Sequence, residues 1–153
     1  FGWAKPVPIN TRYFKKPRSG MALTALAGPV SNLLMSLVAF IIMRYISAFG
    51  SVSLFSDEVT FLQLLYIFFD TFFLMNLCLA VFNLIPVPPL DGSRVLFVFL
   101  PDKLYFGIMR YEQYINIALI ACLFFGVLDT PLNFIVNLFI RLFYWLTGLL
   151  PLL

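Results

Sequence analysis

The side chain best suited to chemistry is Asp91, a carboxylate inside a long apolar stretch. It follows the prolines Pro86, Pro88 and Pro89 and precedes Gly92. Because prolines cannot continue a helix, the backbone must open here. Non-helical backbone flanked by apolar sequence is tolerated at membrane depth only where protein buries it or a water-filled cavity wets it. We therefore expect Asp91 to face a polar pocket; the alternative is an ordinary turn or helix-cap aspartate.

A second polar side chain, Asn32, lies in the apolar stretch 21–43. Thr24, Gly28, Asn32 and Ser36 recur every four residues, so they share one face of a helix. Small and polar residues at this spacing let membrane helices approach closely. The face is predicted to point into the protein, where an interhelical hydrogen bond is the simplest role for the Asn32 amide.

The composition predicts that lipid is the main solvent of these elements. Of the 153 residues, 62% are hydrophobic and 11% charged, against roughly half and a quarter in soluble domains. The net charge of +3 does not indicate nucleic-acid binding, because five of the ten basic residues lie between Lys5 and Arg18. That cluster is typical of a cytoplasmic flank near anionic lipid headgroups. No nucleic-acid partner is expected.

The hydrophobicity pattern predicts an all-α fold, a polytopic transmembrane helix bundle with a Pro-rich broken segment that presents an aspartate to the membrane-embedded site. A single membrane-embedded domain is expected over residues 1–153, with segment 1–19 cytoplasmic or interfacial. The predicted hydrophobic helices cover 21–43, 59–84, 114–128 and 131–150, and a Pro-rich turn with a following helix covers 85–100.

Two features of these helices remain open. Asp129, Thr130 and Pro131 form a helix start directly after the third predicted helix, which suggests a tight hairpin. The last helix could pack, line a cavity or lie in the interface. Asp70 and Arg141 are ionisable residues in apolar runs, and a structural pair between them is conceivable without support from any motif.

One segment matches a family pattern at every specified position. The pattern is N-x-x-P-x-P-x-L-D-G, and the matching residues are Asn83, Pro86, Pro88, Leu90, Asp91 and Gly92. Two further segments, 1–8 and 28–32, also resemble the bacterial and archaeal members of that family. The chain therefore resembles the site-2 proteases, intramembrane zinc proteases, over most of residues 1–95.

The resemblance implies a zinc metalloendopeptidase that cleaves transmembrane peptides or proteins in a prokaryotic cell membrane. It assigns Asp91 as the third protein ligand of a catalytic zinc, which lowers the pKa of bound water to about 7. The prolines would fix the loop, and Gly92 would allow close approach. Asn32 resembles a family asparagine assigned to steadying the substrate carbonyl or the oxyanion; an interhelical hydrogen bond is the alternative.

The sequence departs from the family in one respect: it contains no histidine. The family's other zinc ligands are two histidines of an H-E-x-x-H helix, whose glutamate is the general base. In the family that helix lies N-terminal to the segment that residues 1–8 resemble, and the chain does not begin with Met, so we expect the helix to precede Phe1. One zinc is then expected per complete protein and none in this chain alone. The alternatives are a non-catalytic membrane subunit or pseudoprotease, or a transporter. The sequence does not indicate the oligomeric state.

Overall fold

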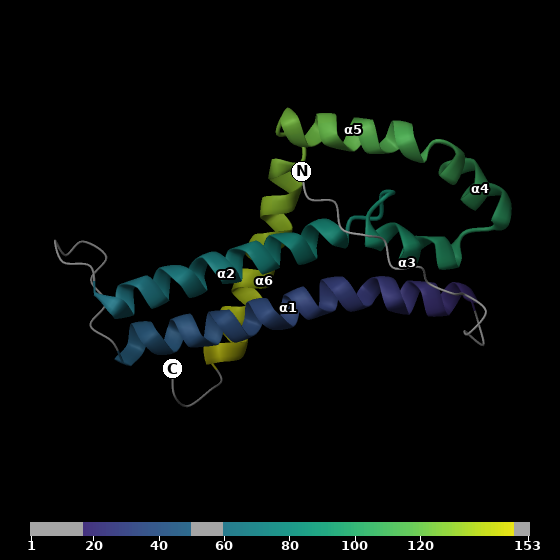
Figure 1. The fold of residues 1–153 in the computed structure, drawn as a ribbon. Helices are drawn as coiled ribbons and strands as arrows, with labels where there is room; N and C mark the ends of the chain where they lie inside the picture. Colours follow the sequence, from purple (N-terminus) through teal and green to yellow (C-terminus); the bar gives the residue numbers. More distant parts are fainter. Residues whose placement is uncertain (1–16, 50–59, 149–153) are drawn as a thin grey trace.

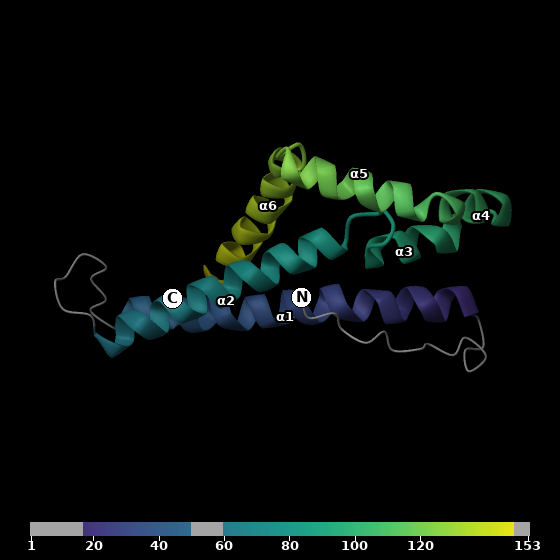
Figure 2. The same cartoon turned by 45° about the horizontal axis from the view of Figure 1, so that its top comes forward.

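The first two helices of the chain form an antiparallel pair. The computed structural model describes residues 17–49 and 60–148, and these form six α-helices with no strand. Helix α1 (Pro17–Phe49) packs along α2 (Phe61–Asn83), and the two run in opposite directions in both views (Figures 1 and 2). The all-helical class expected from the sequence is confirmed for the described residues.

Length and composition make α1 and α2 candidate membrane spans. The 33 residues of α1 extend about 50 Å at 1.5 Å per residue, and the 23 residues of α2 extend about 35 Å. Both exceed a hydrocarbon core of roughly 30 Å. Helix α1 includes the predicted range 21–43 and continues beyond both ends, while α2 begins two residues after the predicted start at 59 and ends one residue before 84.

The start of α2 is set by a capping box. The Thr60 side chain accepts a hydrogen bond from the Gln63 backbone N–H, and the Thr60 N–H donates to the Gln63 side chain. This capping box gives hydrogen-bond acceptors to the backbone N–H groups of Thr60 and Gln63, which would otherwise have no partner at the start of the helix. No such pair ends α2, which stops at Asn83 just before the Pro-rich segment.

Four further helices follow, of which the first three are short. Helix α3 (Asp91–Phe99) packs on the N-terminal half of α1, and α4 (Asp102–Arg110) leads into α5 (Glu112–Phe124). Helix α6 (Asp129–Gly148) then crosses the α1–α2 pair (Figure 1). With 13 residues, or about 20 Å, α5 is too short to span alone, and it is a candidate span only together with α6.

The predicted hairpin between the last two helices is wrong. The chain bends by 79° between α5 and α6 instead of reversing. Two residues after the end of α5 at Phe124, Gly126 adopts the left-handed conformation (φ 69°). The Gly126 N–H donates to Leu123 O, and the Val127 N–H donates to Cys122 O at 2.9 Å. These two bonds are a Schellman ending, and a turn of four residues leads to α6.

The main hydrophobic core joins α1, α2 and α6 away from the Pro-rich segment. Phe40 of α1 is 1% exposed and lies between Phe73 of α2, with ring centroids 5.1 Å apart, and Phe143 of α6, at 5.9 Å. Rings at such separations contribute contact energy in addition to their buried area. This aromatic cluster holds α6 on the pair and leaves the N-terminal half of α1 free to pack against α3.

Candidate active site

The Asp91 carboxylate lies against α1 at Gly28. Asp91 is half-buried as the first residue of α3, and a Cβ placed on Gly28 would lie 3.6 Å from its Oδ2 atom. The two positions are 63 apart in the sequence numbering, so only the packing of α3 on α1 brings them together. Because Gly28 has no side chain, the Asp91 carboxylate faces the backbone of α1 at this position.

Gly92 is required by the path of the Pro-rich segment. A Cβ on Gly92 would lie 2.6 Å from Ile85 O and closer still to Leu84 O, and both atoms belong to the backbone. Any side chain would therefore push the segment away from the start of α3. Glycine at this position allows the end of α2 and the first turn of α3 to approach closely, which fixes where Asp91 points.

Short-range hydrogen bonds hold the segment between the two helices. Leu90 N–H donates to Val87 O at 3.0 Å, and both the N–H and the hydroxyl of Ser93 donate to Leu90 O, the latter at 2.7 Å. Asn83 and Leu90 are half-buried, Pro88 is buried and forms a cis peptide bond with Pro89, and Pro86 is exposed. The segment is a compact turn rather than an extended loop.

Asn32 lies one helical turn beyond Gly28 on the same face of α1, about 6 Å further along the axis. It is half-buried. The row of small and polar residues to which it belongs divides along α1: Thr24 and Gly28 are exposed, whereas Ser36 is fully buried. The predicted inward orientation of this face is thus confirmed at Ser36, whereas Thr24 is exposed and Gly28, also exposed, faces the Asp91 carboxylate. The open part of the face lies beside Asp91.

Asp91 is a carboxylate donor, and the described residues place no cluster of metal-ligating side chains around it. Within 17–49 and 60–148, no three His, Cys, Asp or Glu side chains gather closely enough to hold a metal ion. Histidine is missing from all 153 residues. A half-buried carboxylate at a helix start, facing an exposed glycine on the neighbouring helix, is a donor that a zinc ion could use together with other ligands.

The remaining polar candidates in apolar runs lie elsewhere. Asp70 is half-buried in α2, and Arg141 is exposed on α6. They form no ion pair with each other in the part of the chain that the structure describes. Sequence reasoning missed Arg94, one turn after Asp91 on α3, which lines a cavity with Glu112 of α5. The signal that could have indicated Arg94 is its position as a cation three residues after Asp91 in an apolar stretch, because ionisable residues in such stretches are often functional.

Comparison with known proteins identifies relatives of this arrangement. YwhC of Bacillus subtilis, whose name describes it as a candidate zinc metalloprotease, is 40% identical over 114 residues, which are 74% of this chain and 50% of YwhC. The zinc metalloprotease MJ0392 of Methanocaldococcus jannaschii is 31% identical over 132 residues, which are 82% of this chain and 34% of that protein. The chain thus spans a third to a half of the curated relatives it matches.

No solved structure gives a significant match. The family model described as "Peptidase family M50" matches residues 5–128, which include Gly28, Asn32 and the whole Pro-rich segment with Asp91. The matched range therefore includes every residue of the site described above. The resemblance to the site-2 proteases is confirmed, and the chain belongs to peptidase family M50.

Proposed function

We propose that residues 1–153 are part of an intramembrane zinc endopeptidase that hydrolyses peptide bonds of transmembrane substrates, with Asp91 as the third protein ligand of the zinc. The observation that carries this proposal is the placement of the Asp91 carboxylate on the open face of α1 at Gly28, one turn from Asn32. The two histidine ligands and the general base would come from outside residues 1–153, because these contain no histidine.

Each residue of the site has a separate task in this proposal. Asp91 supplies an anionic oxygen, and the compact turn closed by Gly92 fixes its direction. Gly28 is the point of α1 that faces the carboxylate, at a distance that would also admit a methyl group. The Asn32 amide is a neutral donor that can orient a substrate carbonyl and stabilise the charge that develops on its oxygen. Bound zinc would polarise that carbonyl and provide a water with a pKa near 7.

Removal of zinc tests the proposed activity. We expect the complete protein, purified in detergent, to cleave a transmembrane peptide substrate, to lose that activity with a chelator and to regain it when zinc is added in slight excess. Zinc analysis should give about one ion per chain, as for a mononuclear catalytic site. A complete protein that is well folded and binds no zinc would instead be a non-catalytic relative, which is the second candidate.

Asn32→Ala in the complete protein should separate catalysis from metal binding. Loss of one oxyanion donor typically lowers turnover by about 10²- to 10³-fold, and the substitution leaves Asp91 untouched. We expect a fall of that size in kcat with an unchanged zinc content. Zinc content and activity falling together would make Asn32 a structural residue that supports the α1–α3 contact.

A further inference from the structure

A cavity lies beside α3, one helical turn along from Asp91, at the end of the bundle where α1 begins. It has a volume of about 370 Å³, is open on one side, and is lined by residues of α1, the Pro-rich segment, α3, α4 and the first turn of α5. That volume is within the range of roughly 300–1,000 Å³ for small-molecule pockets. The apolar part of its wall includes Met21, Phe97, Val98, Phe106 and Met109.

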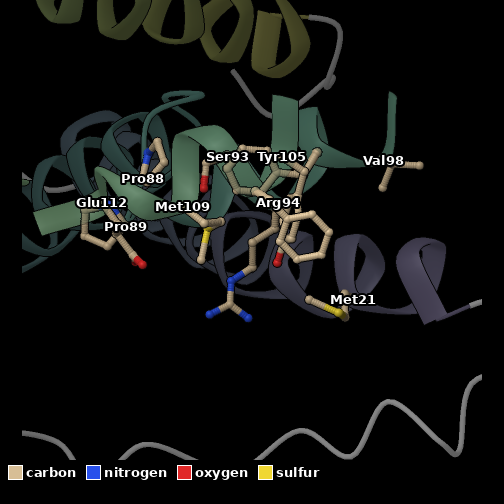
Figure 3. A pocket seen from close by; sticks show the side chains of 11 residues that line it. Met21, Pro88, Pro89, Ser93, Arg94, Val98, Tyr105, Met109 and Glu112 are labelled. Atoms are coloured by element: carbon tan, nitrogen blue, oxygen red, sulfur yellow. The ribbon is translucent and has the colours of Figure 1, made fainter. Parts of the chain in front are cut away.

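Two opposite charges interrupt this apolar wall. Arg94 of α3 is exposed, Glu112 of α5 is half-buried, and both line the cavity. Figure 3 shows the Arg94 side chain extending away from α3. Neither side chain forms an ion pair among the described residues. The cavity therefore offers one cation and one anion that do not neutralise each other.

The position of the cavity along α1 sets its depth in the membrane. Met21, which lines it, is the first residue of the apolar stretch 21–43, and the preceding segment is basic. Tyr105 also contributes to the wall, while Tyr111 and Tyr114 are exposed nearby on the chain. Tyrosines and basic residues collect where lipid headgroups meet the hydrocarbon. The residues around the cavity are thus those typical of the headgroup level of a membrane.

We propose that this cavity binds a zwitterionic aminophospholipid such as phosphatidylethanolamine. Arg94 donates hydrogen bonds to the phosphate, Glu112 accepts hydrogen bonds from the primary ammonium, and the glycerol and upper acyl carbons contact the apolar wall. Charge complementarity selects this headgroup: phosphatidylglycerol has no cation for Glu112, and the trimethylammonium of phosphatidylcholine has no N–H to donate.

Lipid binding to the complete protein in detergent tests this assignment. Native mass spectrometry would compare phosphatidylethanolamine, phosphatidylglycerol and phosphatidylcholine with identical acyl chains. For the unaltered protein, phosphatidylethanolamine should bind most tightly. Arg94→Gln should weaken the binding of phosphatidylethanolamine and phosphatidylglycerol alike, by about tenfold, the loss expected for one charge-assisted hydrogen bond. Arg110→Gln, an exposed arginine of α4 outside the cavity, is the matched control and should change nothing.

Glu112→Gln supplies the sharper test because it predicts a change of preference. It should lower the affinity for phosphatidylethanolamine by about tenfold, whereas that for phosphatidylglycerol should stay the same or rise, because a like charge is removed. This ratio remains measurable even if Arg94→Gln fails to fold. An unchanged preference in Glu112→Gln overturns the proposal, as does equal binding of phosphatidylcholine by the unaltered protein. Stoichiometric displacement of the lipid by a substrate peptide would also overturn it and assign the cavity to substrate.

Discussion

Asp91→Asn in the complete protein should abolish proteolysis and lower the zinc content. Asparagine has the same size as aspartate but no charge, so its amide oxygen is a much weaker zinc ligand. Even partners that only support a metal ligand lower affinity by roughly 10- to 100-fold when lost, and a direct ligand should cost at least as much. Cleavage of a transmembrane peptide and zinc content, measured on the same preparation, are the two readouts.

Asp129→Asn is the matched control. Asp129, like Asp91, is an aspartate in the first turn of a helix, but it begins α6 and is exposed. Any effect of a first-turn charge on its helix is therefore common to both variants, while the effect on zinc should be confined to Asp91→Asn. Normal cleavage by a zinc-containing protein with asparagine at position 91 would falsify the assignment of Asp91 as a ligand.

The sequence was sufficient to predict the long helices because their signal is local. The apolar stretches around α1 and α2 are longer than a membrane needs, and the prolines from Pro86 onward follow the end of α2. The angle between α5 and α6 does not follow from the helix-start signal at Asp129 and Pro131, which marks where α6 begins but not its direction. Gly126 ends α5 earlier through its left-handed conformation, and a glycine in that place is a recognisable stop signal.

The candidate site likewise has features that the local sequence predicts and features that depend on packing between distant segments. The motif predicted Asp91 and the need for glycine at 92, since both depend on the chain within ten residues. It could not predict that Gly28 is the residue facing the carboxylate, because the register of α3 on α1 follows from their packing. For the same reason the sequence could not predict that Arg94 and Glu112 line one cavity.

Gly92→Ala should damage both stability and activity, whereas Gly28→Ala should be tolerated. The new methyl at position 92 would meet the carbonyl oxygens of Leu84 and Ile85, which are backbone atoms and cannot rotate away. Overpacking of this kind costs about 1–3 kcal/mol. The turn must shift to relieve it, and Asp91 shifts with it. We expect a lower unfolding temperature in detergent, a lower zinc content and the loss of most proteolysis.

Gly28→Ala makes the same chemical change on the facing helix with different expected results. Its methyl would lie 3.6 Å from Asp91 Oδ2, an ordinary van der Waals distance. Position 28 is exposed and helical, and alanine favours a helix by up to about 1 kcal/mol relative to glycine in water. Stability should therefore be equal or slightly higher, with zinc retained. If Gly92→Ala were as stable and active as Gly28→Ala, the close approach of the Pro-rich turn to α3 could not be what positions Asp91.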